Sequence, residues 1–134
     1  MEDKAVYFER ILKAGTKHPR LNSVLWLLLY REGCEYYDID RTKAECILEL
    51  IILIDKITQE NDVNIMSEKF FNLDTKFKEL LNEILSKKIN EMDERFKIIV
   101  SSTDEDDIDE RDDIERAREY FMFAKKAINK LEII

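Results

Sequence analysis

Residues that break helices are almost absent from this chain, since only two glycines and one proline occur in 134 residues. An all-β fold needs frequent turns, and turns rely heavily on glycine and proline. The chain is instead rich in Leu, Ile, Glu and Lys, which favour long helices. A length of 134 residues suits one hydrophobic core. The sequence therefore predicts a single all-α domain over residues 1–134.

The segment Lys43–Ile57, KAECILELIILIDKI, is the most apolar helix candidate, because ten of its fifteen residues are apolar. A helix that is apolar almost all round has to be surrounded by other elements. Its start can be capped by Asp40, or by Thr42 together with Glu45 in a T-x-x-E capping box. We expect this segment, 43–57, to be the central helix of the domain.

Apolar residues at three- and four-residue steps place the other helices around it. The two longest amphipathic segments should pack as an antiparallel pair, which gives a bundle of about five helices. Ser102 with Glu105 forms a second capping-box pattern before the last helix. The expected elements are a helix over 2–14, a second helix that stops at Gly33, an irregular connector Cys34–Asp40, the central helix, a short turn holding Phe70 and Phe71 that Ser67 caps, and the pair 73–100 and 104–132.

The net charge of −8 is confined to one short segment. Residues 104–115 hold nine acids and one base, Arg111, whereas 21 acids face 21 bases in the rest of the chain. An acidic patch on an otherwise neutral protein disfavours nucleic acid as a partner there. The acids are Asp104, Glu105, Asp106, Asp107, Asp109, Glu110, Asp112, Asp113 and Glu115.

Four interpretations of this acidic segment remain open. The acids can simply be a solvated helix start, because the helix dipole favours acids there. They can form a docking patch for a basic protein partner. A special case is an inhibitor or immunity protein of phage or viral type that mimics nucleic-acid charge. A calcium loop starting at Asp104 would fit at Asp106 and Glu115, but Ile108 and Asp109 occupy positions that break the pattern.

Two tyrosines, Tyr36 and Tyr37, fall in the predicted connector after the second helix. Tyrosine is enriched in protein interfaces, and loop residues are well placed to meet a partner. We therefore count both tyrosines as candidate partner-binding residues beside the acidic segment. Trp26, within the run SVLWLLLY, is expected to belong to the core.

Catalytic patterns are scarce. Glu45 and Glu49 share a helix face at a spacing of four residues and could hold Mg²⁺ in an all-α hydrolase, provided that a second helix adds carboxylates. His18 is the only histidine, and no nucleophile pattern accompanies it. No glycine-rich phosphate loop can be built from Gly15 and Gly33 alone. We expect no enzyme activity, no cofactor and no metal.

These patterns favour a non-enzymatic protein–protein interaction module: an adaptor, a small subunit of a complex, or an inhibitor. The apolar runs fall well short of the roughly 20 residues that span a bilayer, and Cys34 and Cys46 form no disulfide framework. We therefore expect a cytoplasmic protein without membrane contact. The long apolar stripes of 73–100 and 104–132 also predict a homodimer.

Overall fold

The computed structural model describes residues 21–60 and 62–129, which form helices and contain no strand. The all-α prediction is confirmed. The predicted helix over 2–14, and His18, lie outside the described residues. The described helices are α2 (Leu21–Ile39), α3 (Arg41–Thr58), α4 (Val63–Phe71), α5 (Thr75–Ile99) and α6 (Glu105–Ile128).

Helix α2 is longer than the sequence predicts, because it continues through Gly33 to Ile39. The predicted stop at Gly33 and the irregular connector after it are therefore wrong. Leu25, Leu29, Gly33 and Tyr37 follow one another at four-residue steps, and all four are buried. A glycine inside a helix costs about 1 kcal/mol, whereas burial of each large side chain contributes about 1.5–3 kcal/mol. The burial of Leu25, Leu29 and Tyr37 thus outweighs the free-energy cost of a glycine inside the helix.

Helix α3 begins directly after α2, at the cap that Asp40 provides. The Asp40 Oδ1 atom accepts a hydrogen bond from the Lys43 backbone N–H at 3.1 Å, so Asp40 rather than Thr42 is the cap. Helix α3 packs against α2, α4 and α5. One side of the helix still faces outward, since Ile52 is 42% exposed. The buried residues of α3 are Ala44, Ile47, Leu48, Leu50, Ile51, Ile54 and Ile57.

Two further caps differ from the predicted ones. Helix α4 begins at Val63, because the Asp62 carboxylate accepts hydrogen bonds from two backbone N–H groups of the first turn. Ser67 therefore lies inside α4 and does not cap it. Helix α6 begins after Asp104, whose Oδ1 accepts from the Asp106 N–H at 2.9 Å. Ser102 instead accepts from the backbone N–H of Asp104, so the predicted capping box does not form.

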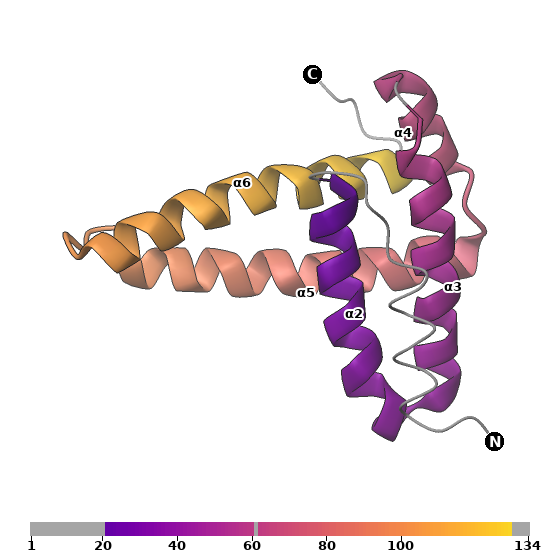
Figure 1. The fold of residues 1–134 in the computed structure, drawn as a ribbon, viewed down its shortest axis with the longest axis horizontal. Coiled ribbons are helices and arrows are strands. Elements are labelled where there is room, and N and C mark those ends of the chain that lie inside the picture. Colours follow the sequence, from indigo (N-terminus) through magenta and orange to yellow (C-terminus); the bar gives the residue numbers. More distant parts are fainter. Residues whose placement is uncertain (1–20, 61, 130–134) are drawn as a thin grey trace.

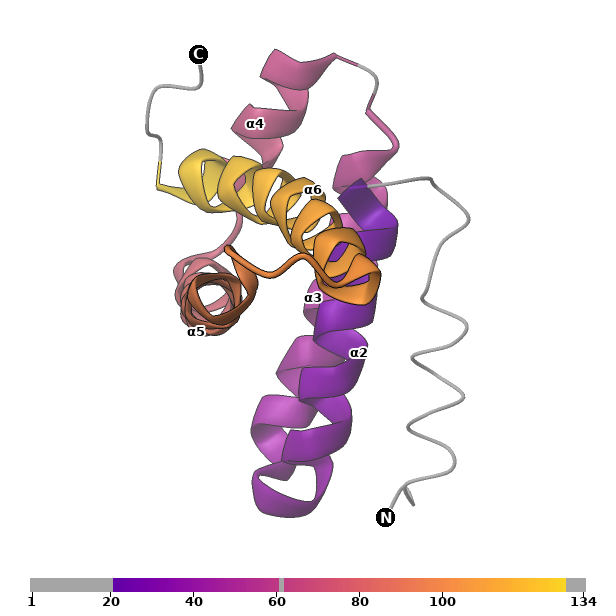
Figure 2. The same cartoon turned by 90° about the vertical axis from the view of Figure 1, so that its left-hand side faces the viewer.

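The helices form two antiparallel hairpins, α2–α3 and α5–α6, that cross each other, with α4 packed against α3 and α6 (Figures 1 and 2). All five described helices contribute to one buried cluster. The predicted pairing of the two long helices is confirmed. No described helix is long and apolar enough to span a membrane.

The buried residues of α6 all lie in its second half: Phe121, Ala124, Ala127 and Ile128. The first half of α6 therefore extends past the core, together with the last turns of α5 (Figure 1). We call this part, residues 93–115, the hairpin end. It carries the whole acidic segment.

Candidate functional site

Three of the nine acids in the acidic segment 104–115 have a structural role. Asp104 caps α6. Glu110 Oε2 accepts a hydrogen bond from Arg95 Nε at 2.6 Å, and Asp107 Oδ1 lies 3.9 Å from Arg95 Nη2. These contacts join α6 to α5. The hydrogen bond that the guanidinium donates to Glu110, the largest cause, raises the pKa of Arg95.

Three bases of the hairpin end, one in the acidic segment and two on α5 beside it, are each engaged by neighbours within the hairpin end. Arg95 is held by Glu110 and Asp107. Lys97 Nζ lies 3.0 Å from Glu94 Oε1. Arg111 donates to the backbone carbonyls of Val100 and Ser102 and so satisfies two carbonyl groups in the connection between the helices. None of these bases neutralises the remaining acids.

Four exposed aspartates of α6 make no ion pair with any residue in the described part of the chain: Asp106, Asp109, Asp112 and Asp113. They recur at steps of three and four residues, which places them along one side of the helix. We call these four residues the open acidic stripe. The stripe is a concentrated negative surface on the projecting half of α6.

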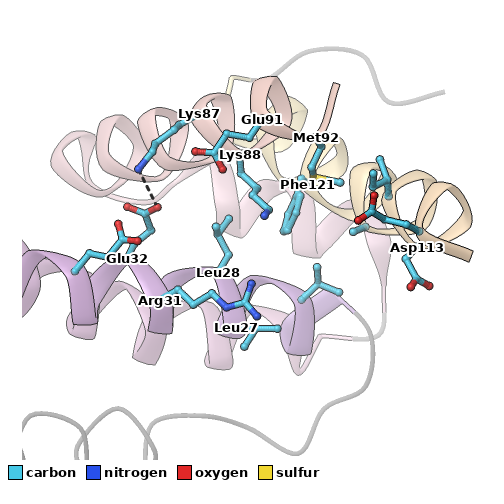
Figure 3. A pocket seen from close by; sticks show the side chains of 15 residues that line it. Leu27, Leu28, Arg31, Glu32, Lys87, Lys88, Glu91, Met92, Asp113 and Phe121 are labelled. Atoms are coloured by element: carbon cyan, nitrogen blue, oxygen red, sulfur yellow. Dashed lines mark hydrogen bonds and ion pairs between the residues drawn. The ribbon is translucent and has the colours of Figure 1, made fainter. Parts of the chain in front are cut away.

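A groove of about 440 Å³ lies beside the stripe, between α2, α5 and α6. Its floor is apolar, because Leu28, Met92 and Phe121 are each at most 6% exposed there. Figure 3 shows Asp113 at one end of the groove and the ion pair between Glu32 and Lys87, 3.4 Å apart, at the other. The other lining residues are Val24, Leu27, Arg31, Glu35, Lys88, Glu91, Glu110, Ile114 and Ala117.

The Glu32–Lys87 pair links α2 to α5 at the edge of the groove. Glu32 is 8% exposed, so its carboxylate is the buried member of the pair. The negative charge of Glu32, the largest cause, raises the pKa of Lys87. The pair holds one wall of the groove in place and keeps a buried acid neutralised.

The two candidate tyrosines are not part of this site. Both lie in α2, not in a connector, and neither lines the groove. Tyr37 is 5% exposed, with the Arg41 guanidinium 3.7 Å from its ring centroid. Tyr36 is half-buried beneath Lys43. Tyr37 is thus a core residue, and its loop assignment was wrong because α2 does not end at Gly33.

The carboxylate pair of α3, Glu45 and Glu49, belongs to no larger cluster of metal-binding side chains in the described part of the chain. Glu49 is exposed and Glu45 half-buried, and residues 21–60 and 62–129 contain no group of three or more His, Cys, Asp or Glu side chains that could hold a metal ion. Within those residues the Mg²⁺ alternative therefore lacks the additional carboxylates that it requires. The calcium-loop pattern fails as well, because residues 105–115 are helical.

The sequence did not predict the groove, although part of its signal was visible. Ile114, Ala117 and Phe121 continue the apolar period of α6 into its acidic half. The structure leaves Ile114 and Ala117 half-buried, because neither α2 nor α5 covers them fully. Comparison of the chain with protein-family models, with curated proteins and with solved structures gave no match.

Proposed function

We propose that this protein is a non-enzymatic interaction module, an adaptor, small complex subunit or inhibitor, that binds a basic protein through the open acidic stripe. The observation that supports the proposal is the separation of charges at the hairpin end. Arg95, Lys97 and Arg111 are all engaged locally, whereas the four aspartates of the stripe are exposed. Such an excess of one charge attracts a partner of opposite charge.

The helix dipole does not account for the whole stripe. It favours acids in the first turn, where Glu105, Asp106 and Asp107 lie. Asp109, Asp112 and Asp113 lie beyond that turn, and like charges spaced three or four residues apart destabilise a helix by about 0.2–0.5 kcal/mol per pair. Acids that repel one another and cover no part of the core support a role in binding.

The test neutralises the acids that have no structural role. Asp109, Asp112 and Asp113 are replaced together by Asn, and the matched control replaces the exposed residues Glu49, Glu68 and Glu79 by Gln, with the same change in net charge. Wild-type protein and both variants are immobilised and exposed to an extract of the source cells. We expect proteins retained by the wild type and the control to be lost with the aspartate variant, and to elute at about 0.3 M salt. Equal retention by all three proteins would overturn the proposal.

A narrower form of the same function is inhibition by mimicry of nucleic-acid charge. The retained protein would then be a nucleic-acid-binding enzyme, because phosphates and the stripe would use the same basic surface. Addition of a DNA or RNA duplex during capture would displace it from the wild-type protein. If neither duplex reduces capture, the mimicry of nucleic-acid charge is excluded, and the partner is a basic protein that does not bind nucleic acid through the same surface.

Self-association is a second proposal, supported by apolar residues at the hairpin end. Ile98 is 71% exposed, Val100 45% and Ile108 38%. Large apolar residues that are exposed near one another can mark an interaction site, so we propose that a second copy covers these residues in a homodimer. Light scattering should give a dimer mass for the wild type and a monomer mass for Ile98→Asp. A monomer at high concentration would contradict the dimer.

A further inference from the structure

We propose that the groove between α2, α5 and α6 binds the apolar face of an amphipathic helix from the basic partner, while the basic flank of that helix lies on the open acidic stripe. The inference rests on the proposed function and extends it. It names the class of partner segment and a second contact surface.

The groove is built to accept apolar side chains. Leu28, Met92 and Phe121 form a floor that is part of the buried core. Leu27, at the edge, is 43% exposed although it is a large apolar residue. Ala117 leaves room on the α6 side because its side chain is small, and it is only half-buried. A partner that inserts apolar side chains here would bury Leu27 and Ala117 and remove more apolar surface from water.

The size of the groove indicates how a helix would sit. One turn of an α-helix with its side chains is a cylinder about 11 Å wide and 5.4 Å high, or about 500 Å³. The groove measures about 440 Å³, so it cannot contain a helix of several turns. It can receive the side chains of a helix that lies across its mouth. Recognition by such anchors, at i, i+3, i+4 and i+7, is a recurring mode of helix binding.

The charges around the groove favour a basic flank on the α6 side. Asp113 lines that wall beside Glu110, which Arg95 already engages, and Asp109 and Asp112 continue the negative surface along α6. Apart from Glu110, four acids of the groove oppose three bases: Glu32, Glu35, Glu91 and Asp113 against Arg31, Lys87 and Lys88. Lys87 is already paired with Glu32.

Arg31 and Lys88 are the two remaining bases of the groove, and they lie on opposite sides of it, on α2 and α5 (Figure 3). Their long apolar stems can cover part of the floor while the charged ends stay in water. Both lie away from Asp113, toward the middle of the groove (Figure 3). The positive flank of the bound helix therefore belongs over α6, and its α2 side should be neutral, because Arg31 and Glu35 balance each other on that wall.

The experiment measures the affinity of the full chain for two synthetic peptides of leucine and lysine. The first has about 18 residues, or five helical turns, with leucine confined to one face. The second has the same composition in scrambled order, so it has the same charge and no apolar face. Fluorescence anisotropy gives the Kd of each. We expect the amphipathic peptide to bind at least about tenfold more tightly, a difference of about 1.4 kcal/mol.

Two variants locate the effect. Ala117→Phe fills the groove from α6 without a change of charge, and Leu27→Ser removes an exposed apolar contact and serves if Ala117→Phe does not fold. Each should reduce the preference for the amphipathic peptide to about twofold or less, and leave binding of the scrambled peptide unchanged. Replacement of Asp109, Asp112 and Asp113 by Asn should instead weaken both peptides alike.

The remaining outcomes separate the two proposals. Equal binding of both peptides by the wild type overturns the groove inference and leaves the acidic docking function standing. Binding of neither peptide overturns both. A dimer that Ala117→Phe converts to a monomer assigns the groove to a second copy and overturns the inference. The sequence predicts segment 2–14 to be amphipathic, so this segment is another possible occupant of the groove. If the amphipathic peptide binds tightly only after Phe8→Asp and Leu12→Asp, the groove belongs to the chain's own segment 2–14, and the inference is overturned.

Discussion

Arg95 of α5 and Glu110 of α6 join the two helices of the hairpin end through a hydrogen bond of 2.6 Å between Nε and Oε2. The two residues are fifteen positions apart in the sequence. Their contact neutralises a carboxylate that would otherwise add to the negative surface. The same arginine also attracts Asp107. One base thus engages two of the nine acids in the segment 104–115.

Removal of this arginine should strengthen binding of basic ligands. In Arg95→Gln, Glu110 and Asp107 lose their cation, and one more negative charge acts on a ligand at the surface. We expect the scrambled leucine–lysine peptide to bind about two- to fivefold more tightly at low salt. Lys69→Gln on α4, which releases Glu60 from its ion pair away from the acidic segment, is the control with the same charge change. Weaker binding by Arg95→Gln than by this control would show that the pair organises the site.

Neutralisation of the stripe should stabilise the free protein. The three aspartates form six like-charge pairs at three- or four-residue spacing, with one another and with Glu105, Asp106, Glu110 and Glu115, and two opposite-charge pairs with Arg116. All of these pairs disappear in the triple Asn variant, so the net loss is of repulsion. Each like-charge pair costs about 0.2–0.5 kcal/mol, and the melting temperature at low salt should rise by a few degrees. At about 1 M salt the gain should vanish, because the repulsion is screened. A lower melting temperature at low salt would mean that the acids have a structural role.

The two tyrosines should differ in their effect on stability. Tyr37 is 5% exposed and packs in the core, so Tyr37→Ala should cost about 3 kcal/mol, as for other large aromatic residues replaced by alanine. Tyr36 is half-buried, and Tyr36→Ala should cost about half as much. Urea unfolding of both variants measures the difference. Equal losses would contradict the burial pattern at the end of α2.

The Cys46 thiol should react slowly at neutral pH. Its burial, the largest cause, raises its pKa, and the nearby Lys76 only partly opposes that effect. Alkylation by iodoacetamide, followed by peptide mass spectrometry, should therefore reach half its maximal rate at a higher pH than in a short peptide spanning residues 43–49. The folded state holds the thiol proton more tightly than the unfolded state does. The contribution of this thiol to the stability of the fold is therefore fully present below its ordinary pKa, and it is lost as pH rises through the raised pKa of the folded state. A half-maximum at or below the peptide value would contradict the prediction.

Several parts of the fold could be predicted because they depend on neighbours in sequence. The periodicity of 73–100 located α5 to within two residues, and Asp40 was among the predicted caps of α3. Predictions failed where a distant contact opposed the local signal. Gly33 suggested a helix end, but a ridge of buried residues continues α2 past it. Tyr37 was consequently expected on a loop and lies in the core.

The candidate site shows the same division. That nine acids follow one another in residues 104–115 is a property of the sequence. The sequence does not show which of these acids are engaged by a base, since the partner of Glu110, Arg95, comes from another helix. The groove likewise needs three helices at once, because α2, α5 and α6 each supply one wall.

The sequence by itself determined that this chain is helical, where most of its helices lie and where its net charge gathers. These properties arise from composition and from interactions between residues at most four positions apart. Only the tertiary structure decided which acids are left open, that Tyr37 is buried, and that an apolar groove lies beside the stripe. Those features depend on how α5 and α6 align with each other and with α2, and that alignment is set by packing between residues far apart in the chain.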